Sequence, residues 1–202
     1  MIKAVAATDI NKKKSVSKYF SIEAYFKAEE KSLTKNEYHA GIIIPVMAGG
    51  KLRHNLIAQK AGSLMLFFIE EYALDYKVSN SDTKIRIEDF DKIVYPDALV
   101  ICGIPLFYNK REDTITNPLL VVEVLSASTM QHDRTTKFEM YRTIPSFKEY
   151  VLIYQDRKHI VVWTKQTDGA WLPVDYIGDD SIALLHSLNN CPISLERLYK
   201  GL

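Results

Sequence analysis

Two acidic residues beside short apolar segments are the strongest candidates for chemistry in this chain. Asp97 stands directly before the run Ala98–Cys102, and Glu123 follows directly on the run Leu119–Val122. Both runs contain β-branched residues and have the length of buried strands. A carboxylate next to a buried strand is costly to desolvate unless a cation compensates its charge. The two acids therefore predict a site for a divalent metal ion.

The ligand chemistry of such a site favours magnesium. Mg²⁺ is held by oxygen atoms, and the carboxylates of Asp97 and Glu123 with the main-chain carbonyl of Val124 would leave positions for water and a phosphate oxygen. Mn²⁺ is the expected substitute, and no organic cofactor is expected. An ammonium group nearby would orient the attacking water and stabilise charge that grows on the phosphorus oxygens. The predicted chemistry is hydrolysis of a phosphodiester.

Each of these residue types also has a structural interpretation. Asp97 follows Pro96 at the start of a strand, where aspartate often forms a turn hydrogen bond. Asp133 would cap the helix that it begins, and Lys137 would pair with Asp133 at i, i+4 on the surface. Two unpaired acids at core strands are expensive without a partner, so the pair of Asp97 and Glu123 favours the functional interpretation.

The composition predicts one soluble domain without a global attraction for polyanions. With 47 % apolar residues, 202 residues can bury an ordinary core, and we expect a single domain over residues 17–202 after a flexible arm of residues 1–16. The net charge of +1 gives no pull toward nucleic acid or membrane, so a polyanion site must come from a local cluster. The longest apolar run, Leu64–Ile69, is too short to span a bilayer, and the start lacks the apolar region of a signal peptide, so a cytoplasmic location is expected. Cys102 and Cys191 have no metal or redox spacing and are expected to be reduced packing residues.

The first half of the chain predicts a long helix with a basic entrance. From His54 to Tyr72, apolar residues recur at helical spacing and define one buried face. The entrance from Gly49 carries Lys51, Arg53 and His54 beside main-chain N–H groups, and helix N-termini of this kind bind phosphate. These three residues are candidate contacts for nucleic acid. A glycine turn with solvated charges is the structural alternative.

Shorter elements flank this helix. Ser21 is expected to cap a short helix, and the strand Ile42–Ile44 is confined to an edge by Pro45. Further strands are expected at Tyr76–Val78 and Lys84–Ile87. The second of these is expected to have one wet face, because its polar and apolar residues alternate.

The second half of the chain predicts a helix followed by antiparallel strands. The helix runs from Asp133 to about Arg142, with Arg134 and Lys137 on its wet face, and Arg134 is a further candidate contact for nucleic acid. The strands expected after it are Glu149–Tyr154, His159–Lys165 and Trp171–Ile177.

A combination of short motifs covers about residues 20–200. Its central pieces are Tyr95-Pro96-Asp97, Val121-Val122-Glu123-Val124-Leu125-Ser126, Ser128-Thr129, Asp133-Arg134, Lys137 and Tyr141. Its flanking pieces are Glu37 with Gly41, Met47, His54-Asn55, Ile144-Pro145-Ser146, Glu149 to Leu152, Val161 to Trp163 and Trp171. In this combination the chain resembles the Uma-type putative restriction endonucleases of the PD-(D/E)XK nuclease superfamily.

The resemblance implies an α/β (α+β) fold with a restriction-endonuclease-like three-layer core, in which a central mixed sheet is flanked by helices and extended by a C-terminal β-hairpin. It implies Mg²⁺-dependent hydrolysis, with Asp97 and Glu123 as metal ligands and Glu37 as an accessory acid and ligand from the first helical region. The superfamily motif places a lysine two residues after the second acid, whereas this chain has Leu125 there. Lys137 in the following helix is the expected replacement.

The main expectation is therefore a metal-dependent endonuclease acting on DNA. A different class stays open, a catalytically inactive nuclease fold that serves as a nucleic-acid-binding or assembly module, which Leu125 and the near-zero net charge favour. Hydrolysis of RNA or another phosphodiester is a third alternative, because no motif separates these substrates. A homodimer is expected for an enzyme that cuts two antiparallel strands with one site per chain, through the edge strands after Tyr150.

Overall fold

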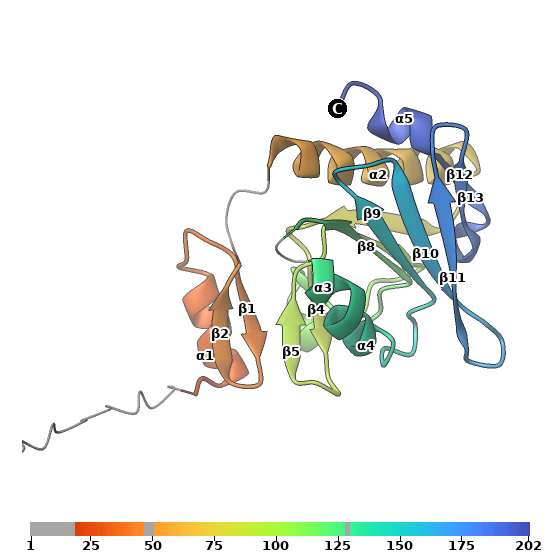
Figure 1. Cartoon of the computed structure of the whole chain (residues 1–202). Coiled ribbons are helices and arrows are strands. Elements are labelled where there is room, and N and C mark those ends of the chain that lie inside the picture. Colours follow the sequence, from red (N-terminus) through yellow and green to blue (C-terminus); the bar gives the residue numbers. More distant parts are fainter. Residues whose placement is uncertain (1–18, 47–50, 128–129) are drawn as a thin grey trace, which may run out of the picture.

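The computed structural model describes residues 19–46, 51–127 and 130–202, and two large sheets organise them (Figure 1). The helical segments are α1 Ile22–Glu29, α2 Leu52–Glu71, η1 Tyr108–Lys110, α3 Met130–His132, the π-helical η2 Asp133–Lys137, α4 Phe138–Tyr141, η3 His186–Leu188 and α5 Leu195–Tyr199. The strands are β1 Asn36–His39, β2 Ile42–Pro45, β3 Tyr76–Asn80, β4 Lys84–Ile87, β5 Lys92–Val94, β6 Ala98–Cys102, β7 Thr114–Ile115, β8 Leu120–Leu125, β9 Glu149–Tyr154, β10 His159–Lys165, β11 Trp171–Ile177, β12 Ile182–Leu185 and β13 Cys191–Ser194. The expected arm, the turn at residues 49–50 and the hydroxyl pair 128–129 lie outside the described residues.

A six-stranded mixed sheet forms the centre of the fold. Its strand order is β11-β10-β9-β8-β6-β3, in which β8 and β9 run parallel and the other neighbouring pairs run antiparallel. This confirms the expected central mixed sheet, and the C-terminal hairpin β9–β10 is part of that sheet. One boundary was wrong: β8 continues to Leu125, because Val124 and Leu125 extend the ladder alongside β9. Glu123 therefore lies inside a strand and not after it.

Helices cover both faces of the central sheet, which confirms the expected layers. Alternate residues of a strand point to opposite faces. On one face, residues such as Val122 pack against the buried stripe of α2 that includes Ile57 and Met65, and α5 lies beside it. On the other face, residues such as Val121 pack against Phe138 of α4. Truncating the fully buried Ile57 to alanine would cost about 2–5 kcal/mol.

The long helix and the short first helix both match their sequence signals. α2 begins at Leu52, two residues before the predicted start at His54, and ends next to Tyr72. The Oγ atom of Ser21 accepts a hydrogen bond from the Ala24 N–H, so the predicted cap of α1 is confirmed. No described helix is long and apolar enough to cross a membrane.

A second, five-stranded sheet was not anticipated from the sequence. Its order is β2-β1-β5-β4-β7, with β2 at an edge as Pro45 predicts. The expectation that β4 has a wet face was wrong, because all four of its residues are buried. Lys84 and Arg86 are covered by ion pairs with Asp113 at 2.7 Å and Asp91 at 2.8 Å. Pairing lets the two cations enter the interior that the alternation assigned to solvent.

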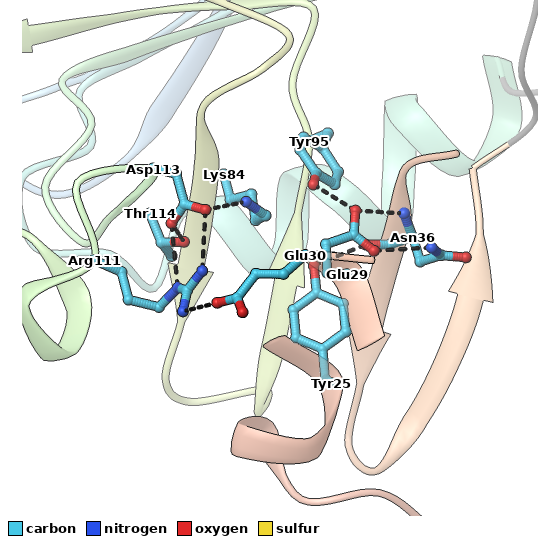
Figure 2. A network of polar contacts seen from close by, with 9 residues as sticks. All are labelled: Tyr25, Glu29, Glu30, Asn36, Lys84, Tyr95, Arg111, Asp113 and Thr114. Carbon is cyan, nitrogen blue, oxygen red and sulfur yellow. Dashed lines mark hydrogen bonds and ion pairs between the residues drawn. The ribbon is translucent and has the colours of Figure 1, made fainter. Parts of the chain in front are cut away.

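A polar network joins α1 to this second sheet (Figure 2). The carboxylate of Glu29 accepts hydrogen bonds from the Tyr95 hydroxyl at 2.8 Å and from the Asn36 side-chain amide at 2.8 Å. Glu30, the residue after α1, reaches the other way and pairs with Arg111 at 2.9 Å. The contact between Glu29 and Tyr95 ties the helix to the short segment that leads from β5 into Asp97.

Two further expectations need correction. The helix predicted to begin at Asp133 begins at Met130, so Asp133 lies within it and does not cap it. Cys102 is exposed at the end of β6 and is not a packing residue, whereas Cys191 is buried as expected. Both cysteines are free thiols.

Candidate functional site

The register between β6 and β8 brings the two predicted acids together. Ala98 is paired with Val122, and the next step of the same antiparallel register places Asp97 opposite Glu123. Glu123 shares its face of the sheet with Val121 and so points toward the helical layer of η2 and α4. Opposed positions on one face of an antiparallel pair lie within contact range. The two carboxylates therefore lie near each other at one end of the central sheet, close enough for the charge of Asp97 to act on Glu123.

The π-helical segment η2 places the ammonium group of Lys137 beside the carboxylate of Glu123. The Nζ atom of Lys137 lies 3.0 Å from Oε1 of Glu123 and 3.3 Å from Oδ1 of Asp133. The lysine side chain is 11 % exposed, so the expected wet position of Lys137 was wrong. It lies on the same side of the helix as Asp133, which is buried rather than solvated. π-Helical turns are rare and occur frequently at functional sites.

A tyrosine completes the contacts to Glu123. The hydroxyl of Tyr141 donates a hydrogen bond to Oε1 of Glu123 at 3.1 Å, and the hydroxyl of Tyr150 donates to the main-chain carbonyl of Asp133 at 2.9 Å. Asp133 and Tyr141 were not among the predicted site residues. Their spacing from Lys137, four residues on either side, was the sequence signal that could have found them.

Lys137 is surrounded by more carboxylates than ammonium groups: Glu123, Asp133 and Glu37 all act on it. Burial raises the pKa of Glu123 well above its ordinary value, and the nearby charges of Asp133 and Asp97 raise it further, against the opposing effect of Lys137. Burial alone would lower the pKa of Lys137. The surrounding carboxylates, led by Glu123 and Asp133, reverse this effect and raise the lysine pKa. A single ammonium thus serves several carboxylates.

Asp97 is held by the strand and by α2. The main-chain N–H of Val124 donates to Oδ2 of Asp97 at 2.7 Å, and Nε2 of His54 lies 3.3 Å from the same oxygen. The hydrogen bond between His54 and Asp97 raises the pKa of His54 despite partial burial. A hydrogen bond between His54 and the main chain of Val124 adds to this rise. His54 therefore contacts the predicted metal ligand as well as standing at the helix entrance.

Glu37 occupies a strand and not the predicted helical region. It lies on β1, where its carboxylate contacts Nε2 of His39 at 2.8 Å and accepts a hydrogen bond from the Tyr95 N–H at 3.3 Å. Burial would raise the pKa of Glu37, but the contact with His39 and the charge of Lys137 outweigh burial and lower it. The acid is thus electrostatically coupled to Lys137 while its direct contacts are to β1 and Tyr95. Its role as a metal ligand stays a prediction.

The other predicted nucleic-acid contacts differ in exposure, and their role stays a prediction. Lys51 is exposed at the start of α2. Arg53 is partly buried, and its Nε donates to the main-chain carbonyl of Gln155. Arg134 is exposed on η2, as expected.

The donor set fits a hard divalent cation. Within the described ranges, no three His, Cys, Asp or Glu side chains form a group that could hold a metal ion. The candidate ligands are instead two carboxylates, those of Asp97 and Glu123, with the carbonyl of Val124. Oxygen donors of this kind suit Mg²⁺ or Mn²⁺. Burial is the main cause of the raised pKa of Glu123, and the charges of Asp133 and Asp97 add to it; a bound cation would favour the ionised carboxylate.

Comparisons with known proteins give one family and two similar proteins. The model of the Uma2 family, described as "Putative restriction endonuclease", matches residues 22–196. In Synechocystis sp., "Uncharacterized protein sll1609" is 32% identical over 167 residues, which is 83% of this chain and 93% of that protein. "Uncharacterized protein slr1290" of the same organism is 33% identical over 184 residues, or 90% of this chain and 92% of that protein.

A solved structure has the same fold. It is described as a "putative nuclease belonging to DUF820 from Anabaena variabilis ATCC 29413", and it superposes with a TM-score of 0.69 at 16% identity over 89% of this chain and 97% of that one. The likeness confirms the restriction-endonuclease-like core expected from the sequence.

Proposed function

The chain belongs to the Uma2 family, and from this membership and the geometry of its acidic cluster we propose that it is an endonuclease that hydrolyses phosphodiester bonds in DNA with Mg²⁺. The observation that carries the proposal is the convergence of Asp97, directly before β6, with Glu123 of β8 and Lys137 of η2. A buried acid next to a second acid and an amine that are both largely covered is expensive to keep without a chemical role.

The metal ligands in this proposal are the carboxylates of Asp97 and Glu123 and the carbonyl of Val124. When bound, Mg²⁺ would supply Lewis-acid polarisation of a phosphoryl oxygen and lower the pKa of a bound water. Mn²⁺ would substitute, since it accepts the same oxygen ligands.

Side chains of the protein orient the two carboxylates and supply a positive charge for the phosphate. The ammonium of Lys137, held by Glu123 and Asp133, stays protonated because its pKa is raised, so it can stabilise negative charge that develops on the phosphate. Tyr141 fixes one oxygen of Glu123, and the Val124 N–H fixes one oxygen of Asp97. Both carboxylates are thereby oriented before substrate binds.

Plasmid nicking tests the proposal. Purified protein should nick supercoiled DNA in Mg²⁺ or Mn²⁺, and EDTA should stop the reaction. Asp97→Asn and Glu123→Gln keep the size of each side chain and should reduce nicking by at least about 10²-fold. Asp82→Asn, which changes an exposed turn acid, is the matched control and should cleave like wild type. Full cleavage by the purified double variant D97N/E123Q would refute the proposal.

A catalytically inactive nuclease fold is the second candidate. Leu125 occupies the motif position of the lysine and is buried in the core, and Lys137 is engaged by two carboxylates. Under this alternative, wild-type protein and E123Q would bind DNA equally and neither would cut. Parallel assays on duplex DNA, single-stranded DNA and RNA separate DNA cleavage from hydrolysis of another phosphodiester.

Dimerisation belongs to the same proposal. An enzyme with one site per chain would need two copies to cut both strands of a duplex. β11 is an edge strand of the central sheet and offers Leu172 and Val174 to solvent. Sedimentation equilibrium should give twice the chain mass, and a monomer at micromolar concentration would contradict this part of the proposal.

A further inference from the structure

An open groove lies beside the helix that carries Lys137. It has a volume of about 610 Å³, which is within the range of ligand sites. One wall is the helix face formed by Arg134, Phe138 and Arg142 at i, i+4 and i+8. Lys137 belongs to the neighbouring face of the same helix, so the groove and the Lys137–Glu123 pair lie on adjacent sides of one helix.

The opposite wall is the hairpin of β10 and β11. Trp163 and Lys165 are two residues apart on β10 and therefore share a face of the sheet. Trp171 is the direct cross-strand partner of Lys165, so its side chain lies on the same face. Pleat and register together place two indole rings and an ammonium along one side of the groove.

The two indole rings pack on phenylalanine rings of the core. The centroid of the Phe138 ring lies 4.9 Å from that of Trp163 and 5.2 Å from that of Trp171. Trp171 also packs on the buried Phe147 at 5.3 Å. Both tryptophans are only partly buried, so each ring is anchored on the core and still lines the groove. A fixed aromatic surface loses little conformational entropy when a ligand stacks on it.

The charge of the lining is positive. Arg134, Arg142 and Lys165 contribute three cations, and Glu139 contributes one carboxylate, which pairs with Arg142 at 3.1 Å. Cations next to flat aromatic rings match a phosphate backbone with accessible bases. The faces of bases inside a duplex are covered by stacking, so these rings can be used only by an unpaired segment.

We propose that the groove between η2–α4 and β10–β11 binds an unpaired segment of nucleic acid strand, with bases stacked on Trp163 and Trp171 and phosphates on Arg134 and Lys165. This proposal rests on the proposed nuclease function. The groove would hold a strand that is unpaired near the scissile bond and keep it beside the acidic cluster. The occupant is a nucleic acid strand and not a protein.

Intrinsic fluorescence tests this directly, because the chain has two tryptophans and both line the groove. The probe is a (dT)₁₀ oligonucleotide, titrated into the full chain in EDTA so that no cleavage occurs. Saturable quenching is expected with the single strand, and a duplex of equal length should quench much less.

Charge variants on the surface locate the binding. Arg134→Ala with Lys165→Ala should weaken binding of (dT)₁₀ and reduce the slope of log K against log salt by about 1.4, because each phosphate contact on a single strand contributes about 0.7. The matched control, Lys27→Ala with Lys31→Ala on and beside α1, removes the same charge elsewhere and should leave binding unchanged. Trp171→Leu should weaken binding about 5- to 150-fold, and Trp171→Phe should restore most of it.

Three outcomes would overturn the groove proposal: equal quenching by duplex and single strand, an unchanged salt slope in the R134A/K165A variant, or a fluorescence change that depends on protein concentration alone, which would indicate a second copy in the groove. E123Q should bind (dT)₁₀ like wild type while losing cleavage. Quenching without any cleavage by wild type would refute the nuclease function alone, and cleavage without quenching would refute the groove alone.

Discussion

The Nζ atom of Lys137 lies 3.0 Å from Oε1 of Glu123 and joins the π-helical segment η2 to strand β8. The residue two positions after Glu123 is Leu125, an apolar side chain packed in the core. The helix thus supplies the amine that the strand does not carry. Since both partners of the pair are buried, a change at Lys137 is expected to alter stability as well as turnover.

Replacing Lys137 by methionine keeps the length of the side chain and removes its charge. Glu123 and Asp133 would then be buried without their cation, so the free energy of unfolding at pH 7 should fall by about 3–5 kcal/mol. The loss should shrink toward acidic pH, where Glu123 takes up a proton. DNA cleavage should fall by at least about 10²-fold. Urea unfolding and plasmid nicking measure the two effects. Lys148→Met, at an exposed position, is the control, and equal behaviour of both variants would show that the pair has neither role.

Tyr141 and Tyr150 offer a matched comparison of hydroxyl groups. Tyr141→Phe removes a hydrogen bond to the Glu123 carboxylate and should lower the free energy of unfolding by about 1.5–3 kcal/mol. Tyr150→Phe removes a hydrogen bond to a main-chain carbonyl and should cost about 0.5–1.5 kcal/mol. Both residues are fully buried, so the two Tyr→Phe substitutions leave the ring packing equally intact and differ mainly in the hydrogen bond that is lost. The order of the two losses in urea unfolding checks whether Glu123 is ionised in the folded protein; a reversed order would indicate a protonated Glu123.

Strand and helix positions followed closely from periodicity, whereas the polar interior did not. β6, β9, β10 and β11 were predicted with their observed bounds because their residues alternate or form short apolar runs between turns. β4 shows why the second sheet was missed. Lys84 and Arg86 read as solvent-facing, and their burial depends on ion pairs with Asp113, far along the chain, and with Asp91, at the end of the following turn. The alternation of polar and apolar residues does not show either pairing.

The residues of the candidate site likewise fall into those that local sequence signals predict and those that depend on the tertiary structure. Asp97 and Glu123 were found because an acid beside a buried strand is unusual in any context. Asp133 was interpreted as a helix cap, since a short acid at an expected helix start normally has that role. The helix begins three residues earlier, at Met130, and its π-helical turn changes which residues face the sheet. A local deviation of this kind depends on packing against β8 and cannot be derived from spacing alone.

Asp113 should give the protein an acid-sensitive contact between β4 and the loop before β7. Burial alone would raise the pKa of Asp113, but hydrogen bonds with Lys84 and Arg111 outweigh burial and lower the pKa to about 2 (Figure 2). A lowered pKa stabilises the fold fully above the unfolded-state value of about 3.9, and this contribution is lost as the pH falls through about 2. Asp113→Asn should therefore reduce the free energy of unfolding near pH 6, and the difference from wild type should disappear toward pH 2. Asp89→Asn, at an exposed turn, should show no such pH-dependent difference. A constant difference between D113N and wild type over this range would contradict the assignment.

Addition and removal of Mg²⁺ should change the melting temperature through Asp97 and Glu123. A ligand that binds only the folded state stabilises it by mass action, so for a dissociation constant on the order of 1 mM, about 10 mM Mg²⁺ adds about 1.4 kcal/mol. For a chain of this size that corresponds to a rise of roughly 3–5 °C relative to EDTA. Asp97→Asn and Glu123→Gln should each abolish the rise whatever their own melting temperatures, because each removes a charged ligand. Lys137→Met should enlarge it, since the ammonium that competes for Glu123 is gone. Glu112→Gln, at an exposed position, should keep the wild-type rise. Calorimetry in EDTA and in Mg²⁺ measures all five proteins. An equal rise in wild type, D97N and E123Q would place the bound metal elsewhere and separate the acidic cluster from metal binding.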